Sequence, residues 1–468
     1  MKRRFPPVLG SSREQGTVLL VAGLSGAYAA ALMMASSMLS TIEEIGTGAK
    51  AGMSLNVVST VFILIALYVA AVVITGCVAT VIAGRLRQVA LLRILGADGR
   101  DLRRSIRLST ARTGAIGALL GVLVGTVLAD AARLVLLARA TVPEGRYSWA
   151  TLSLVWPIIA ITVASAVAGW IGSRRILEVT PAQALADVDL GEVSTRGTLR
   201  LRFAFSMVLI VLGAGGLLWA VQLGENPDTA SGFIVAFFAS AASATGVLLG
   251  ARFIVPRVVA ALSRLLGTDP SSVIARRNAT ADPLRTTRST VGLIVGVTLI
   301  TTFASGASAL RTSINHSGGL TVDQRAQSEQ WLSIMAAVMM CVVLISCIIS
   351  CVGFVSTMSL TVIQRRREIG LLRALGFTAA QIRSMITRES VALSATAMLL
   401  GVFLGVIYGS VGAQALVGSF TPGFAWGLPW PVLAAIAVGG VILVFLASKP
   451  PARRAIAVSP VDALHAAG

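Results

Sequence analysis

Ten apolar runs of about 20 residues or more constrain this chain more than any other feature of its sequence. They lie at about 17–39, 57–83, 113–136, 151–172, 203–222, 232–255, 290–310, 331–361, 391–418 and 430–448. A run of about 20 apolar residues is long enough to cross a bilayer as a helix. Only 13% of the residues are charged, against roughly 25% in soluble proteins. The sequence therefore predicts an all-α polytopic membrane protein with about ten transmembrane helices. It excludes a disordered chain, a disulfide-rich secreted domain and an ordinary cytosolic enzyme.

The basic residues indicate how the helices are oriented in the membrane. If the N-terminus is cytoplasmic, 33 of the 39 Lys and Arg lie in or beside cytoplasmic segments, and 6 lie on the outer side. Positively charged loops remain in the cytoplasm, so we expect a plasma-membrane protein with both termini cytoplasmic. The first run is also compatible with a signal peptide cleaved near residues 35–37. Its length, and a matching helix before the second repeat described below, favour an uncleaved helix.

The net charge of +19 does not indicate nucleic-acid binding. The arginines lie between apolar runs, and aromatic residues do not alternate with them as a base-stacking surface requires. No metal site is expected, because the four cysteines lie inside predicted spans and the two histidines, His316 and His465, fall on opposite sides of the membrane. Charged residues are also nearly absent from the span interiors, which disfavours an ion-coupled carrier. Asp130 and Arg133, one turn apart near the outer end of the third span, are predicted to form a structural pair, with a substrate or gate role as the alternative.

An internal repeat divides the chain into related halves. Residues 85–107 and 365–387 align without gaps at an offset of 280, with nine of 23 positions identical. Near the end of each half, RRILEVTPAQAL is matched by RRAIAVSPVDAL at an offset of 279. Shared membrane composition does not explain this agreement, because the identical positions include Arg, Gly and Pro.

The repeat predicts the domain organisation. We expect a first four-helix repeat in 1–195, two linking helices in 196–270 and a second four-helix repeat in 271–468. Six helices separate equivalent positions, so both repeats have the same orientation and are related by a pseudo-twofold axis along the membrane normal. Small residues recur every four positions in the third helix of each repeat, which predicts close helix packing. The aligned glycines of these series are Gly121 and Gly125, and Gly401 and Gly405.

Each copy of the repeated segment has the pattern of a short helix, a glycine break and a second helix; we call 85–107 the first elbow and 365–387 the second elbow. Gly96 and Gly376 occupy the position of a C′ glycine. Thr378 and Gln381 form a capping-box pattern, and Asp98 is a candidate cap in the first elbow. One such segment is equally compatible with an interfacial helix that contacts lipid. Two copies at equivalent positions favour a docking surface for a partner of twofold symmetry.

The residues expected to form this docking surface are the apolar positions at helical spacing, with their flanking polar residues and the glycine. They are Gln88, Leu91, Leu92, Arg93, Leu95 and Gly96 in the first elbow, and Glu368, Leu371, Leu372, Arg373, Leu375 and Gly376 in the second.

The second elbow resembles the hallmark segment of the FtsX/MacB-type permeases of ABC transporters, R-x-x-E-I-G-x-L-R-A-L-G, from Arg365 to Gly376. The first elbow departs from this pattern, with Gln88, Val89 and Ala90 in place of Glu, Ile and Gly. Residues 275–290 resemble the basic segment that precedes the second half of these permeases. The two SP-VDAL and TP-AQAL endings resemble their usual domain ending.

The resemblance implies a ten-helix permease subunit that is not itself an enzyme. In this family each such segment docks an ATPase subunit, so it implies two ATPase copies for this chain, with ATP and Mg²⁺ bound by that partner. The chain has no G-x-x-x-x-G-K-[ST] phosphate loop, which agrees with this division of labour. The predicted external loops, 40–56 and 311–330, are short, and no extracytoplasmic partner can be named from the sequence.

The sequence offers three candidate functions. The first is export, or extraction from the membrane, of a hydrophobic or amphipathic substrate such as a peptide, lipid or drug, with energy from the separate ATPase. The alternative is a mechanotransmitting subunit that relays ATPase strokes to an extracytoplasmic partner, which longer external loops would favour. A membrane enzyme is disfavoured, because no cluster of catalytic side chains lies at either predicted membrane face.

Overall fold

The structure is a computed structural model that describes residues 12–46, parts of 60–75, 98–138, 154–178, 196–225, 231–264, 269, 273–277, 283–316, 366–418 and 423–456. These residues are helical apart from short turns and caps, and no strand occurs among them. Five of the described helices are long and apolar enough to cross a membrane. They lie within Gly99–Ala131, Leu199–Gly224, Ser231–Ser263, Thr290–Ser313 and Ala379–Val417. The prediction of an all-α polytopic membrane protein is confirmed. The eighth predicted span, 331–361, lies outside the described residues.

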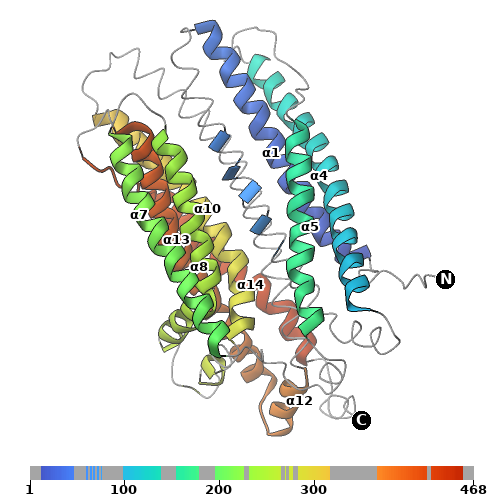
Figure 1. Cartoon of the computed structure of the whole chain (residues 1–468). Coiled ribbons are helices and arrows are strands. Elements are labelled where there is room, and N and C mark those ends of the chain that lie inside the picture. The colour runs from blue at the N-terminus through green and yellow to red at the C-terminus, as the bar shows by residue number, and fades with distance from the viewer. Residues whose placement is uncertain are drawn as a thin grey trace, which may run out of the picture. The chain divides into compact units, whose positions relative to one another are not determined.

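The chain forms two compact units, Met1–Thr195 and Arg196–Gly468. The first unit contains α1 (Ser12–Gly46), α4 (Gly99–Ala138) and α5 (Val155–Glu178), and α4 packs against both of the others (Figure 1). The finer division of the second unit into a linker, 196–270, and a repeat, 271–468, remains a prediction.

Helix α4 approaches α1 closely through the glycine series. A Cβ atom placed on Gly117 would lie 2.6 Å from the carbonyl oxygen of Leu19. One placed on Gly121 would overlap the carbonyl oxygen of Gly23, and one on Gly125 would overlap that of Ala27. Only a residue without a side chain permits this backbone-to-backbone contact, as in other small-xxx-small helix pairs.

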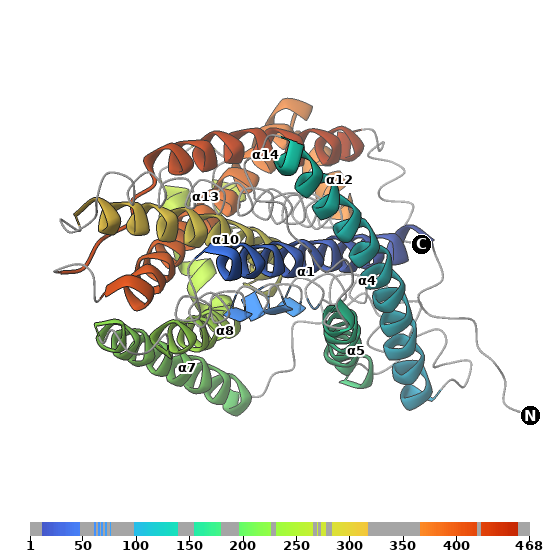
Figure 2. The same ribbon diagram turned by 90° about the horizontal axis from the view of Figure 1, so that it is seen from above.

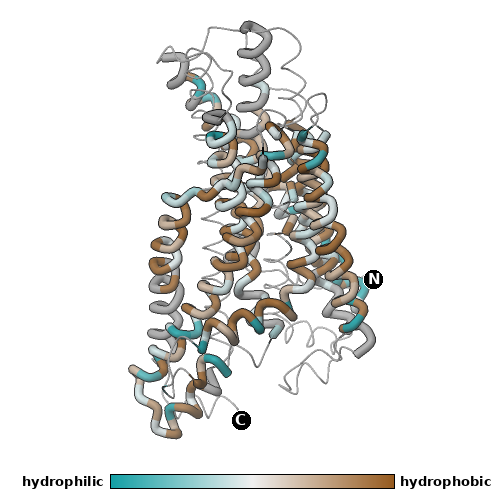
Figure 3. The backbone as a smooth tube through the Cα atoms, turned by 90° about the vertical axis from the view of Figure 1, so that its left-hand side faces the viewer, coloured by the Kyte–Doolittle hydropathy of each residue, from teal (hydrophilic) through white to brown (hydrophobic). Residues whose placement is uncertain are grey.

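The second unit is a larger helix bundle whose elements are α7 (Arg196–Gly224), α8 (Ser231–Ser263), α10 (Pro283–His316), α12 (Arg366–Ala374), α13 (Ala379–Val417) and α14 (Trp430–Ile456). Helix α13 is central, because it contacts α7, α8, α10 and α14. Figure 2 shows α7 lying beside α8. Apolar residues follow these helices along most of their length, as Figure 3 shows.

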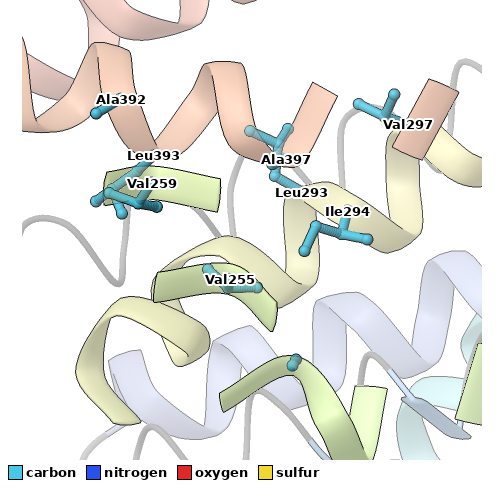
Figure 4. Packing of buried hydrophobic residues seen from close by; sticks show 9 residues of the cluster. Val255, Val259, Leu293, Ile294, Val297, Ala392, Leu393 and Ala397 are labelled. Carbon is cyan, nitrogen blue, oxygen red and sulfur yellow. The ribbon is translucent and has the colours of Figure 1, made fainter. Parts of the chain in front are cut away.

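The core of the second unit lies where α8, α10 and α13 meet. Val255 and Val259 of α8 are completely buried there, against apolar residues of the other two helices (Figure 4). The cluster consists of Ala251, Val255, Val259, Leu293, Ile294, Val297, Ala392, Leu393 and Ala397. Gly401 and Gly405 of α13 continue this contact along α10. A Cβ on Gly401 would lie 2.7 Å from the Cβ of Val297, and one on Gly405 would overlap the Thr301 side chain.

Candidate docking elbow

The second elbow contains α12, which ends in a Schellman motif. The N–H of Phe377 donates to the carbonyl oxygen of Leu372 and the N–H of Gly376 donates to that of Arg373, each at 3.0 Å. This pair of bonds needs a left-handed residue at C′, which is usually glycine, and the φ of Gly376 is 95°. The C′ glycine predicted at position 376 is confirmed. It satisfies two carbonyl groups at the end of α12 and turns the chain toward α13.

Helix α13 begins with the capping box that the sequence predicts. The Oγ1 of Thr378 accepts a hydrogen bond from the N–H of Gln381, and the N–H of Thr378 donates to Oε1 of Gln381 at 2.9 Å. Such reciprocal bonds satisfy backbone donors that have no partner within the helix. In the first unit, the Oδ1 of Asp98 accepts from the N–H of Arg100 at the start of α4, which confirms the predicted cap there.

The whole of the predicted first docking surface lies outside the described residues. Its members are Gln88, Leu91, Leu92, Arg93, Leu95 and Gly96.

One face of α12 is held against the base of α13. Ile369 is buried, and Leu372 and Phe377 pack against the same apolar cluster. We call this the elbow cluster; its buried members are Ala275, Ile369, Ile382, Met385 and Ile386. Since Leu372 and Phe377 are the C3 and C″ residues of the Schellman motif, their joint packing is the apolar contact that often accompanies this turn. The cluster therefore fixes the angle between the two helices.

A neighbouring face of α12 presents apolar side chains to the surface. Leu371 is 53% exposed and Leu375 is 71% exposed, and residues four apart lie on one face of a helix. The sequence pattern grouped these leucines with Leu372 in one docking stripe. The structure separates them, because Leu372 packs inward while Leu371 and Leu375 point outward. We call Leu371 and Leu375 the exposed leucine pair.

The polar members of the predicted surface take different positions. Arg373 is half-buried, and Glu368 belongs to α12 by its backbone, while its side chain lies outside the described part of the chain.

Beyond the elbow, Nη2 of Arg388 lies 2.9 Å from Oδ2 of Asp269, an ion pair that links α13 to the segment after α8. In the first unit, Asp130 and Arg133 pair on α4 at 3.7 Å, and both side chains are largely buried.

Sequence reasoning missed the inward half of the elbow. Ile382 and Ile386 are one helical turn apart, and Ile369 lies three residues before Leu372, so both spacings mark inward faces. Ala275, in the short helical segment 273–277, completes the cluster from about 90 residues earlier in the chain. The apolar spacings were readable in the sequence, but this contact depends on the tertiary fold.

Several relatives share part of this chain. The macrolide export ATP-binding/permease protein MacB of Nitrobacter winogradskyi is 34% identical over 142 residues, which are 30% of this chain and 20% of that protein. An uncharacterized ABC transporter permease of Methanocaldococcus jannaschii, MJ1507, is 26% identical over 148 residues, 31% of this chain and 37% of the relative. The pyoverdine export ATP-binding/permease protein PvdT of Pseudomonas putida is 29% identical over 143 residues, with 31% and 20% coverage. The chain thus aligns with well under half of the length of each of these curated relatives.

A family model supplies broader coverage. The model described as FtsX-like permease C-terminal matches residues 60–181 and again residues 329–460. The first match contains the first elbow, 85–107, and the second contains the second elbow, 365–387. Because the two matches together cover more than half of the sequence, and each includes one copy of the repeated elbow, the chain belongs to the FtsX-like permease family.

Proposed function

We propose that this chain is the membrane permease subunit of an ABC exporter, and that a separate ATPase subunit docks on the exposed leucine pair of the second elbow. The observation that carries the proposal is an apolar patch, Leu371 and Leu375, exposed near the C-terminal end of α12, where a Schellman motif ends the helix and the elbow cluster holds it against α13. Family membership supports it, as do relatives whose names describe export ATP-binding/permease proteins.

The elbow is built to transmit force from such a partner. Its inner face packs on the first turns of α13 through Ile382, Met385 and Ile386. Helix α13 then continues without a break for 39 residues, about 58 Å at the rise of an α-helix. A displacement of α12 is therefore carried along α13 to the opposite end of the bundle, and to α10 through the close contacts at Gly401 and Gly405.

The polarity of the exposed leucine pair indicates what its partner surface contains. A groove on the ATPase that accepts two leucine side chains would match this part of the elbow. ATP and Mg²⁺ would be bound by that subunit, and this chain would supply the docking elbow and the path across the membrane.

The substrate class follows less directly. Macrolide and pyoverdine export are named for the relatives above. The external segments 40–56 and 311–330 are short in this sequence and offer little surface for a bulky external adaptor. We therefore favour a hydrophobic or amphipathic substrate taken from the membrane, such as a peptide, lipid or drug. The orientation with both termini in the cytoplasm is part of this proposal.

Charging the exposed leucine pair tests ATPase docking. The double variant Leu371→Asp with Leu375→Asp should lose the ATPase subunit that docks on the second elbow and at least half of the co-purifying ATP hydrolysis, because two desolvated carboxylates oppose an apolar contact. Its elbow cluster should remain intact, since neither leucine belongs to it. The measurement is MgATP hydrolysis of the tagged chain, purified from its native membrane in mild detergent. The matched double variant Leu371→Met with Leu375→Met should retain wild-type hydrolysis. Recovery of full activity with the aspartates would contradict docking at this patch.

The number of ATPase subunits per chain tests the first elbow separately. The repeat predicts two copies, which native mass spectrometry of the same complex would measure. One copy would assign docking to the second elbow alone. In that case Gln88, which stands where the second elbow has Glu368, is the first position to exchange, and Gln88→Glu should restore the second copy. Failure of that restoration would contradict the role given to this position.

A further inference from the structure

The turn between α13 and α14 lies at the end of α13 opposite the elbow, and it lacks charge. No Asp, Glu, Lys, Arg or His occurs from residue 390 to residue 448, which includes most of both helices and the whole turn. The corresponding connection of the first repeat, 139–153, contains Arg139, Glu144 and Arg146. Turns that project into water are usually rich in polar residues, so the second turn is unusual in this chain.

Four large apolar side chains point outward from this turn at alternating positions. Phe424, Trp426, Leu428 and Trp430 are 36%, 60%, 45% and 70% exposed, while Gly427 and Pro429 between them are buried. Such alternation is that of an extended backbone, which directs successive side chains to opposite sides. The rings of Phe424 and Trp426 also pack edge to face, with centroids 4.9 Å apart. We call these four residues the aromatic strip.

The inner side of the turn is fastened to the bundle by buried polar groups. The hydroxyl of Ser305 in α10 donates to the carbonyl oxygen of Gly427 at 2.6 Å, and the N–H of Gly427 donates to the hydroxyl of Ser410 in α13 at 3.1 Å. Both serines are fully buried. Nε2 of Gln414 donates to the carbonyl oxygen of Gly423 at 3.3 Å.

These bonds suit a segment that lies out of bulk water. Irregular backbone in contact with lipid must find its hydrogen-bond partners within the protein, and Gly427 has partners for both of its backbone groups. A side chain at this position is excluded, because a Cβ atom on Gly427 would overlap the carbonyl oxygen of Ser305. The close fit brings the strip against α10 and leaves its large side chains on the outside.

We propose that the aromatic strip is a membrane-interface plate that contacts lipid at the boundary between headgroups and acyl chains, on the side of the membrane opposite the elbow. Tryptophan combines an apolar ring with an N–H donor and is enriched at this boundary. Exposed apolar residues also continue along α14 beyond the strip, where Val438, Val441 and Ile442 are more than half exposed. The plate holds the far end of the α13–α14 hairpin at constant depth, and this role does not depend on which partner docks at the elbow.

Spin-label accessibility measures the position of the strip directly. In a background in which the four native cysteines are replaced by serine, the variants Trp426→Cys and Ala380→Cys each receive a nitroxide and are reconstituted in phosphatidylcholine–phosphatidylglycerol vesicles. Ala380 is exposed at the elbow and serves as the water-facing control. The label at 426 should be relaxed more by oxygen, which concentrates in lipid, than by a water-soluble nickel chelate, with the opposite order at 380. Relaxation mainly by nickel would place the strip in water, and protection from both would indicate a protein cover; each result overturns the proposal.

A second variant tests the serine fastening. Adding Ser410→Ala to the Trp426→Cys chain should raise the nickel accessibility of the label, because Gly427 loses the acceptor for its N–H. Ser394→Ala on the same helix is the matched control, since Ser394 is also buried but its hydroxyl donates to the carbonyl of Val391 within α13. An equal response of the two alanine variants would overturn the fastening role of Ser410.

Discussion

Replacement of Ile382 by aspartate is expected to release the second elbow from the base of α13. Ile382 is completely buried in the elbow cluster. Truncating a buried isoleucine to alanine costs about 2–5 kcal/mol, and aspartate adds the cost of a buried carboxylate without a partner. Because α12 is held to α13 by this cluster, the loss falls on the elbow, and α12 should separate from α13.

Limited proteolysis provides the measurement. In wild-type protein the backbone at Arg373 is held by the Schellman motif, so trypsin should cleave there slowly; in Ile382→Asp cleavage should become rapid. Ala380→Asp is the matched control, because Ala380 is exposed and an acidic residue is favourable in the first turn of a helix. Slow cleavage in Ile382→Asp would contradict the role of the elbow cluster.

Comparison with the exposed leucine pair distinguishes residues that hold the elbow in place from residues that contact the ATPase. Both Ile382→Asp and the double variant Leu371→Asp with Leu375→Asp should lose the ATPase subunit that docks on the second elbow. Only Ile382→Asp should also open the elbow to trypsin, since Leu371 and Leu375 lie outside the cluster. Rapid cleavage of the double variant would show that the exposed leucines also stabilise the elbow.

The sequence predicted those parts of the elbow that depend on local geometry. The glycine at 376 and the capping box of Thr378 and Gln381 each involve residues within one or two turns, so spacing alone identifies them. The separation of Leu371 from Leu372 was not predictable in this way. Both leucines fit the helical spacing, and Leu372 packs inward against a cluster that includes Ala275, which lies in a distant part of the chain.

The turn that carries the aromatic strip, at the other end of α13, also depends on contacts that the sequence does not reveal. Its lack of charge is plain in the sequence, but the hydrogen bonds of Ser305 with Gly427 and Ser410 join residues more than 100 positions apart. A serine in a span also bonds to its own helix, as Ser390 does to the carbonyl of Ile386. Sequence spacing cannot distinguish a serine that bonds within its helix from one that fastens a turn, because both patterns look alike before the helices pack.

Replacement of Gly409 by alanine is expected to destabilise the contact between α10 and α13, whereas Gly412→Ala on the same helix should not. A Cβ atom on Gly409 would overlap the carbonyl oxygen of Thr302 and lie 2.8 Å from the backbone nitrogen of Gly306. The backbone cannot yield as a flexible side chain does, so the two helices must move apart, at a cost of about 1–3 kcal/mol. At Gly412 the nearest atom, Cε2 of Phe233, lies at an ordinary contact distance of 3.7 Å.

The two alanine substitutions are therefore expected to change the melting temperature in different directions as well as by different amounts. Alanine favours a helix over glycine by about 1 kcal/mol, and Gly412→Ala gains this without a clash, so its melting temperature in detergent should equal or exceed that of the wild type. Gly409→Ala should melt at a lower temperature, because the clash outweighs the same gain. If both variants melted alike, α10 and α13 would not touch backbone to backbone at this level. The path by which a displacement of the elbow reaches α10 would then have to lie nearer the elbow, at Gly401 and the cluster around Val297.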